Sequence, residues 1–563
     1  MDGNTTNEID NRLPYRKGWP KPLPILPLGY EHLSSREVRE LFPNKEEIEG
    51  FLKRHGVVFQ FWFPCNRFND WQRPDPENIT LLIHCKGLEN LSVAALEEIR
   101  DSFQNSGWWH QVEFVDYDQV NAPLRCISPD DPIVREWEET QKERVLRMID
   151  DLEWQTVDVF HCGTAIEKDE CPVTVIISAW DATSDVWWEH VLPHIRAECG
   201  LEVRLLQASS MQATSPDDAA TRLAVEAFTG PLAIGGSLGP LGENGTGTLG
   251  GFIKLEWPDG KTEWLGLTNH HVVREDRLKK ATKMHGYFPP NHLLARDSCL
   301  LLVSPSDHDT DTWLSSVAST ITQLETVVNG DPERGLIGLR AKVGLGEASK
   351  AEFLRRNLTK IDNLRSNDAR ARNVNREAGS VIATSGYRTV EIDGRHWCMD
   401  WALVRLPTLR DIDTALETHD MLCELDRWSS KQLMADNRVL KQGRTTGYTE
   451  GRINGIETTV KIAISEEQRN SDSSPRQGSA WAIIDEPGEG TSMIGRSFSA
   501  PGDSGSLILD VNGRVIGLLF ATQNCITYFI PFASVMEDVQ FVTGRRVLTP
   551  TEDITGLEDS TDA

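Results

Sequence analysis

Residues 498–510 read FSAPGDSGSLILD, and this stretch decides the fold prediction. The GDSG tetrapeptide around Ser504 predicts a tight turn that leads into an apolar strand. Such a turn presents a hydroxyl beside backbone N–H groups, and Gly502 has no Cβ to obstruct an unusual backbone angle. The N–H groups of Gly502 and Ser504 are therefore the candidate oxyanion hole. An ordinary hairpin turn is the alternative interpretation.

A serine hydroxyl becomes a nucleophile only with a base that takes its proton and an acid that orients the base. Residues 267–273, LTNHHVV, offer two adjacent histidines at the end of an apolar strand. Residues 399–406, MDWALVRL, offer Asp400 just ahead of another apolar strand. The chain order His, Asp, Ser, with strand-and-turn contexts for all three, predicts a catalytic triad.

These three segments resemble the catalytic segments of the chymotrypsin/trypsin-like (PA clan) serine peptidases, including the intracellular HtrA-like branch. The resemblance covers about residues 230–545 and implies a double β-barrel. In this family the histidine motif has the form Thr-x-x-His-Val, so Thr268 begins the motif and His271 occupies the catalytic position. His270 remains the alternative base. The region 440–453 is similar to the hairpin that opens the second barrel in many trypsin-like proteins.

The resemblance implies a role for each candidate residue. His271 is the base, Asp400 is the acid that orients it, and Ser504 is the nucleophile. Gly502 and Ser504 supply the oxyanion N–H groups, and no cofactor is implied. Neighbouring histidines in an extended strand point to opposite faces, which disfavours a metal site at His270 and His271.

The sequence departs from the family pattern near both catalytic motifs. Val272 and Ala500 stand where extracellular trypsins have disulfide cysteines, and Ser506 replaces the second glycine of the usual GDSGG. The missing cysteines agree with a reducing location. We expect the serine at position 506 to leave the turn around the nucleophile intact.

The separation of the proposed base from the proposed acid exceeds the family's usual few dozen residues. Apolar residues at helical spacing over about 309–328 and 350–366 predict two helices in the intervening chain. They form a helical hairpin inserted in the β domain at about residues 305–375. The hairpin either gates the cleft or only decorates the barrel.

Activation is a separate question. Trypsins pair a new N-terminus with the aspartate before the nucleophile, which is Asp503 here. Ile234-Gly235-Gly236 is similar to such an N-terminus, but no basic cleavage signal precedes it. We therefore expect a site that forms without cleavage. Maturation at Ile234 and ordering of the turn by a partner are the alternatives.

The resemblance also indicates a substrate pocket. In this fold the residue six positions before the nucleophile lines the primary pocket; here it is Phe498, with no acid to receive Lys or Arg. The strand that reaches Ala521 and Thr522 is expected to pair with the substrate backbone, and Tyr528 to narrow the pocket. These residues predict a preference for a small or medium apolar side chain. Phe498 and Tyr528 as plain core residues are the alternative.

Residues 1–215 predict a separate α+β domain with an internal duplication. Each copy reads as strand, strand, helix, strand, at about 56–117 and 156–207. A polar linker leads to the peptidase-like domain, residues 225–545. Residues 546–563 are acidic and lack a core pattern, so they predict a disordered tail.

Composition limits the partners and the compartment. The chain has 58 Lys and Arg against 85 Asp and Glu, a formal charge of −27, which disfavours nucleic acid and anionic membrane surfaces as partners. No stretch approaches the roughly 18 apolar residues of a membrane span, and the N-terminus lacks a signal-peptide core. Ten cysteines occur without a CxxC pair. We expect a cytoplasmic or nuclear protein that is not secreted.

The sequence thus predicts a serine endopeptidase that hydrolyses protein or peptide substrates through a His-Asp-Ser triad and an acyl-enzyme intermediate. The N-terminal domain is expected to bind a regulatory partner or to control access. A catalytically silent, peptidase-like peptide-binding or scaffold protein is the alternative. An esterase is disfavoured because its triad usually appears in the order Ser, Asp, His.

Overall fold

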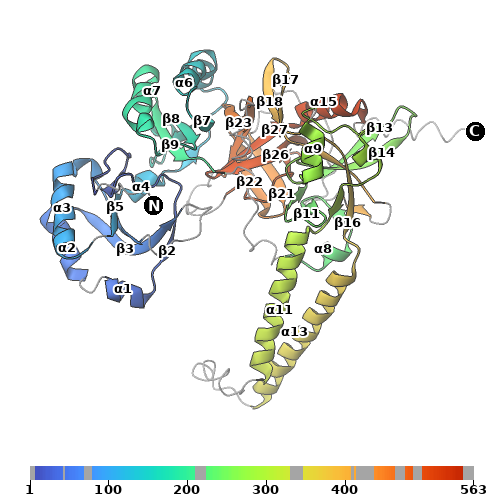
Figure 1. The fold of residues 1–563 in the computed structure, drawn as a ribbon, viewed down its shortest axis with the longest axis horizontal. Coiled ribbons are helices and arrows are strands. Elements are labelled where there is room, and N and C mark those ends of the chain that lie inside the picture. Colours follow the sequence, from blue (N-terminus) through green and yellow to red (C-terminus); the bar gives the residue numbers. More distant parts are fainter. Residues whose placement is uncertain are drawn as a thin grey trace, which may run out of the picture. The chain divides into compact units, whose positions relative to one another are not determined.

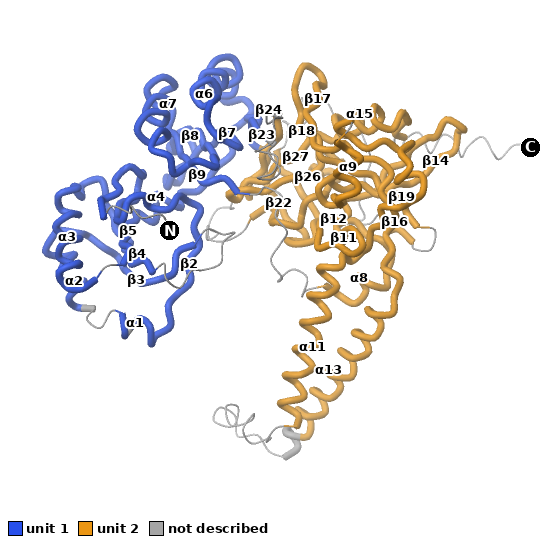
Figure 2. The backbone as a smooth tube through the Cα atoms, viewed as in Figure 1, with its two compact units in different colours: residues 1–209, 454–463, 486–494 blue, residues 210–453, 464–485, 495–563 orange. Residues whose placement is uncertain are grey.

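The computed structural model of the protein describes residues 7–41, 45–68, 79–108, 110–209, 223–283, 285–329, 347–407, 411–413, 437–462, 476–485 and 497–548. The chain forms two compact units (Figure 2). Unit 1 comprises residues 1–209, 454–463 and 486–494, and unit 2 comprises residues 210–453, 464–485 and 495–563. Among the described residues, no helix is both long and apolar enough to cross a membrane.

Unit 1 contains a first sheet of five strands in the order β1-β5-β4-β3-β2 (Figure 1). Helices α2 and α3 pack on one face, where apolar residues of both helices join those of β4 and β5 in one core. Helix α3 begins after Ser92 because the Ser92 hydroxyl accepts the N–H of Ala95 at 3.2 Å. The elements are β1 Arg16–Trp19, β2 Gly29–His32, α1 Ser35–Leu41, α2 Lys45–Arg54, β3 Phe59–Phe68, β4 Ile79–Cys85, η1 Leu88–Asn90, α3 Val93–Asn105, β5 Gln111–Val115 and α4 Tyr117–Val120.

The second part of unit 1 repeats the pairing pattern of the first. Strands β3 and β4 are antiparallel and β4 and β5 parallel; likewise β7 and β8 are antiparallel and β8 and β9 parallel. The predicted order strand, strand, helix, strand is therefore present in both halves. The elements are β6 Leu124–Arg125, α5 Pro132–Glu136, η2 Trp137–Gln141, α6 Lys142–Met148, β7 Trp154–Cys162, η3 Lys168–Glu170, β8 Val173–Ala179, η4 Trp187–Val191, α7 Leu192–Cys199 and β9 Glu202–Gln207.

A strand from much later in the chain completes this second sheet. Strand β23, Thr458–Ile462, pairs antiparallel with β7, with Thr459 opposite Val157. Asn454 precedes it and fixes the segment: its amide oxygen accepts from Ile127 N at 2.9 Å, and its amide nitrogen donates to Val159 O at 2.9 Å. The predicted domain boundaries did not include this segment in the N-terminal domain.

Unit 2 is mostly β. Its first sheet has eight strands in the order β12-β11-β15-β16-β19-β14-β13-β28 and curls around a core of aliphatic residues, Phe252 and Phe288. Strand β28 lies within the predicted tail, so the structure extends the sheet past position 545, and residues 549–563 lie outside the described residues. The elements are α8 Glu226–Thr229, β10 Leu232–Ala233, β11 Gly236–Pro240, β12 Gly247–Leu249, β13 Gly251–Glu256, β14 Thr262–Thr268, α9 Asp276–Lys283, α10 Leu293–Arg296, β15 Leu301–Val303, β16 Glu377–Thr384, β19 Ala402–Arg405, β20 Ile412–Asp413 and β28 Arg546–Leu548.

The other half of unit 2 is a closed barrel of six strands. Successive pairings join β21 to β22, β22 to β24, β24 to β27, β27 to β26, β26 to β25, and β25 back to β21. The predicted hairpin at 440–453 is the β21–β22 pair. The elements are β17 Arg388–Ile392, β18 Arg395–Met399, β21 Arg438–Gly443, β22 Gly447–Ile453, β24 Arg476–Ile484, β25 Leu507–Asp510, β26 Val515–Gln523, β27 Ile526–Pro531 and α15 Phe532–Thr543. A closed barrel beside a curled sheet is consistent with the expected double barrel.

Two long helices, α11 Asp307–Asn329 and α13 Glu347–Asn373, lie side by side and project from the β part of unit 2 (Figure 1). Trp313 and Val317 of α11 pack at their base against Ala371 of α13 and Phe228 of α8. The indole N–H of Trp313 donates to the Leu223 carbonyl at 2.9 Å. This pair corresponds to the helical insertion expected at about 305–375.

Candidate active site

His271 and Asp400 meet because strands β14 and β19 are paired neighbours, with Thr268 opposite Ala402. Nδ1 of His271 lies 2.6 Å from Oδ2 of Asp400, and the His271 backbone N–H donates to Oδ1 at 3.0 Å. The Asp400 side chain is fully buried, whereas one tenth of the His271 side chain is exposed. The carboxylate therefore holds the proton of the imidazole on Nδ1 and leaves Nε2 as a proton acceptor.

His270 has different surroundings and is not the partner of Asp400. Its Nδ1 lies 3.0 Å from the Thr384 hydroxyl, and its ring packs edge-on against Tyr387 with ring centres 4.8 Å apart. The side chain is buried, and burial lowers the pKa of His270 to about 4. It is a neutral packing residue at physiological pH.

Ser504 lies in the nucleophile turn, residues 500–505. The Asp503 N–H donates to the Ala500 carbonyl at 3.0 Å, which closes a four-residue β-turn with Pro501 and Gly502 at its centre. Gly502 has a φ of 97°, so proline at the second position and a left-handed glycine at the third define a type II turn. A residue with a Cβ adopts this φ only with strain. The glycine is thus required by the turn itself.

Two carbonyl contacts orient the peptide groups of this turn. The Thr445 hydroxyl donates to the Pro501 carbonyl at 2.8 Å, and Ser506 donates to the Asp503 carbonyl through its N–H at 3.0 Å and its hydroxyl at 2.6 Å. The N–H of a trans peptide points opposite to its carbonyl. The N–H groups of Gly502 and Ser504 therefore point away from these contacts, and neither has an acceptor among the described residues. Both donors are available to a ligand oxygen.

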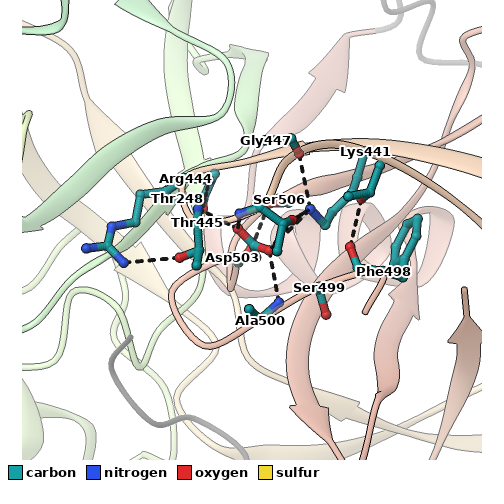
Figure 3. A network of polar contacts seen from close by, with 12 residues as sticks. Thr248, Lys441, Arg444, Thr445, Gly447, Phe498, Ser499, Ala500, Asp503 and Ser506 are labelled. Atoms are coloured by element: carbon teal, nitrogen blue, oxygen red, sulfur yellow. Dashed lines mark hydrogen bonds and ion pairs between the residues drawn. The ribbon is translucent and has the colours of Figure 1, made fainter. Parts of the chain in front are cut away.

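Asp503, a residue of the nucleophile turn, is buried, and hydrogen-bond donors surround its carboxylate (Figure 3). Its Oδ1 accepts the N–H groups of Thr445 and Thr446 at 2.7 and 3.2 Å, and its Oδ2 accepts the Thr446 hydroxyl at 2.7 Å and the Ala500 N–H at 3.0 Å. The ammonium of Lys441, itself fully buried, lies 3.2 Å from Oδ2. Burial lowers the pKa of Lys441, and the neighbouring carboxylate opposes that shift.

The nucleophile turn and the histidine segment adjoin the same strand, β12. The Thr248 N–H donates to the Ser504 carbonyl at 2.8 Å. A Cβ on Gly247 would lie 2.3 Å from the Val272 side chain and 3.1 Å from the Ser504 carbonyl, so both residues approach this glycine closely. Ser504 is thus brought next to the segment that carries His271.

The hydroxyl of Ser504 does not, however, bond to the imidazole. It lies 3.5 Å from the Phe520 carbonyl oxygen, and it makes no hydrogen bond to His271 in the described part of the chain. Ser504 is buried, with 7% of its surface exposed. The structure therefore joins the proposed base to the proposed acid and places the proposed nucleophile nearby, but it leaves the third contact unmade.

The four residues assigned to the substrate pocket lie together in the closed barrel. Phe498, Ala521 and Tyr528 are fully buried, and Ala521 is opposite Tyr528 in the β26–β27 pair. Thr522 is hydrogen-bonded to the Ser499 hydroxyl, which also lies 2.5 Å from the Thr527 hydroxyl. Burial of Phe498 and Tyr528 fits core packing as well as the wall of a closed pocket. Their role in specificity stays a prediction.

Sequence reasoning missed the residues that hold the nucleophile turn. Thr248, Lys441 and Thr445 reach this turn through tertiary contacts that no local motif records. The buried lysine was the one available signal, because a cation in an apolar strand needs a partner. No cluster of three or more His, Cys, Asp or Glu side chains suited to a metal occurs within the described ranges.

No protein-family model and no curated protein matches this sequence. The geometry of the site is therefore the basis for the functional argument.

Proposed function

We propose that unit 2 is a trypsin-like serine endopeptidase with the triad His271, Asp400 and Ser504. The observation that carries the proposal is the His271–Asp400 pair beside a turn with two unoccupied N–H donors. An imidazole fixed as the Nδ1–H tautomer is a base, and two convergent N–H groups stabilise a developing oxyanion. A nucleophilic hydroxyl on that same turn completes the requirements for acyl transfer.

In the proposed reaction, Ser504 Oγ attacks the scissile carbonyl while Nε2 of His271 takes its proton. The oxyanion of the tetrahedral intermediate accepts hydrogen bonds from the N–H groups of Gly502 and Ser504. His271 then gives the proton to the leaving amine, and an acyl-enzyme remains. Water attacks this ester with His271 again as the base, and Ser504 is regenerated. The Asp400 carboxylate stabilises the imidazolium in both steps.

The proposed reaction requires the Ser504 hydroxyl to leave the Phe520 carbonyl and turn toward His271. A serine changes its hydroxyl direction by rotation about one bond between staggered positions. Catalytic hydrogen bonds are often long before substrate binds and tighten in the complex. We therefore interpret the observed contact at 3.5 Å as a resting position.

Two observations favour a site that forms without cleavage of the chain. Lys441 already supplies the cation opposite Asp503, which is the position that a new N-terminus would take. Ile234 lies between strands β10 and β11, and the N–H of the adjoining Gly235 is bonded to the Leu249 carbonyl.

The expected substrates are proteins or peptides with a small or medium apolar side chain before the cleaved bond. The proposed location is the cytoplasm or nucleus, and the proposed role of unit 1 is to bind a regulatory partner.

A catalytically silent peptide-binding protein is the second candidate. The observation that favours it is that the Ser504 hydroxyl donates a hydrogen bond to the Phe520 carbonyl and not to the imidazole of His271. In that case the peptidase-like frame would bind a peptide without cleaving it. The two candidates differ in the reactivity of one oxygen atom.

A fluorophosphonate probe separates these candidates, because it phosphonylates only an activated serine. We expect the native full chain to be labelled at Ser504, and labelling to be lost on denaturation and in Ser504→Ala. The matched control is Ser102→Ala, which changes a serine of helix α3 in unit 1 and should label at the wild-type rate. With a peptide substrate, Ser504→Ala should lower turnover about a million-fold. Failure of the native chain to label would favour the silent binding protein.

A further inference from the structure

Arg444 lies between the nucleophile turn and the start of the helical insertion. Its guanidinium is buried against the equally buried carboxylate of Asp309: Nε donates to Oδ2 at 2.7 Å, and Nη2 bonds to Oδ1. Asp309 is the third residue of helix α11. A carboxylate in the first turn of a helix is stabilised by the helix dipole, and a two-pronged contact fixes the plane of the guanidinium.

Arg444 in turn donates to two threonine hydroxyls, one through its side chain and one through its backbone. Nη1 donates to the Thr445 hydroxyl at 3.1 Å, and the Arg444 N–H donates to the Thr248 hydroxyl at 3.1 Å. A hydroxyl has only one hydrogen to donate. Each threonine oxygen accepts a hydrogen bond from Arg444, and the hydrogen of the same hydroxyl can therefore be donated to a second partner.

The second partner of each threonine is a carbonyl beside the oxyanion donor. The Thr445 hydroxyl donates to Pro501 O at 2.8 Å, and the Thr248 hydroxyl donates to Gly502 O at 2.9 Å. These carbonyls belong to the peptides on either side of Gly502. A continuous chain of hydrogen bonds thus runs from Asp309 through Arg444 and Thr445 to the Pro501 carbonyl, whose peptide carries the Gly502 N–H.

We propose that Asp309 and Arg444 are positioning residues for the Gly502 oxyanion donor, so that the helical insertion holds the catalytic turn in its competent form. The inference rests on the proposed peptidase function. It gives the inserted hairpin a role in the reaction, because its first turn supplies the carboxylate on which the chain of hydrogen bonds begins. Neither residue touches the reacting atoms.

The test compares Asp309→Asn with Asp307→Asn in the full chain. Asp307 is two residues earlier in the same helix and forms a similar pair with Arg376 at 2.6 Å, but it has no contact with the nucleophile turn among the described residues. Loss of one oxyanion donor lowers turnover about 100- to 1,000-fold, so misorientation of Gly502 should lower kcat about 10- to 100-fold. We expect this fall in kcat for Asp309→Asn, with KM unchanged. In Asp307→Asn, both kcat and KM should keep their wild-type values.

Arg444→Lys is a second variant of the same ion pair, and it tests the proposal if Asp309→Asn fails to fold. The lysine keeps a charge for Asp309, but its single ammonium lacks the planar fork that contacts both Asp309 and Thr445. It should lower kcat to the same degree as Thr445→Val, and the double variant should lose little more than either single one, because the residues act through one path. Equal kcat in Asp309→Asn, Arg444→Lys and Asp307→Asn would overturn the proposal.

A second measurement does not depend on activity. Hydrogen–deuterium exchange of peptides that cover residues 498–507 should speed up in Asp309→Asn or Arg444→Lys and stay at the wild-type rate in Asp307→Asn. If the wild-type chain proves inactive while this difference is present, the peptidase proposal fails and the structural coupling holds. Unchanged exchange in all variants would overturn the coupling whether or not the chain is active.

Discussion

At the scale of single residues, the proposed peptidase function depends on which imidazole nitrogen of His271 carries the proton. Asp400 accepts both the backbone N–H and the Nδ1–H of His271. An asparagine at position 400 would keep the size of the side chain, but its amide N–H would favour the other tautomer. We expect Asp400→Asn to lower kcat by about 10⁴-fold with little change in thermal stability. Steady-state kinetics test this expectation, and a fall of less than about tenfold would contradict the assigned role.

His270 should give the protein a pH-dependent stability that is independent of catalysis. Burial lowers its pKa from 6.5 to about 4, so the unfolded chain binds more protons between these values and stability falls as the pH falls through this window. The loss should be on the order of 1 kcal/mol at pH 5.5. We expect His270→Asn, whose side-chain amide can still reach Thr384, to lose less stability than wild type between pH 7 and 5.5 in thermal unfolding. Parallel curves for the two proteins would refute this assignment.

Several residues of the site were predictable and others were not, for a physical reason. The turn around Pro501 and Gly502 is local, because a type II turn needs proline and glycine at fixed positions. The extended strand expected at the two histidines was wrong: strand β14 ends at Thr268, and residues 270–273 form a turn. The residues that bond to the peptides around Gly502 are distant in sequence: Thr248 is 254 positions away from it. A threonine hydroxyl reveals nothing of such a partner from its neighbours in sequence. Lys441 differs in part: a lysine in an apolar strand indicates that a partner is needed, but not that the partner is Asp503.

At the scale of elements, periodicity predicted the repeated order of unit 1 and the two helices of the insertion, but not the other helices and several strands. Both halves of unit 1 show the expected order, and α11 and α13 follow the two apolar stripes. Strand β23 shows the limit, because pairing with β7 joins Thr459 to Val157 across some 300 residues of chain. Strand partners depend on the whole fold, whereas strand formation depends on local pattern.

Asn454 makes that long-range pairing testable. It is buried, and its side chain satisfies the Ile127 N–H and the carbonyls of Val159 and Ile456. Buried backbone groups without partners are costly, so Asn454→Ala should destabilise unit 1 by about 2–3 kcal/mol. Faster hydrogen exchange in residues 154–162 would report the loss. Asn437→Ala, which removes a hydrogen bond to Ile453 in unit 2, is the control and should leave that exchange unchanged.

At the scale of the whole molecule, unit 2 contains a closed six-stranded barrel, a curled sheet and an inserted pair of helices. The resemblance to trypsin-like peptidases implied two barrels but not how the insertion is connected to them. The Asp309–Arg444 pair provides that connection. The pair lies at the start of the insertion, beside the nucleophile turn, and removal of either charge would leave the other buried and unpaired.

The most direct test of the central claim is a crystal structure of the full chain after reaction with a fluorophosphonate. We expect phosphorus on Ser504 Oγ, with the phosphoryl oxygen within hydrogen-bond distance of the N–H groups of Gly502 and Ser504, and His271 still bonded to Asp400. An adduct on another residue, or a phosphoryl oxygen that contacts neither N–H group, would contradict it.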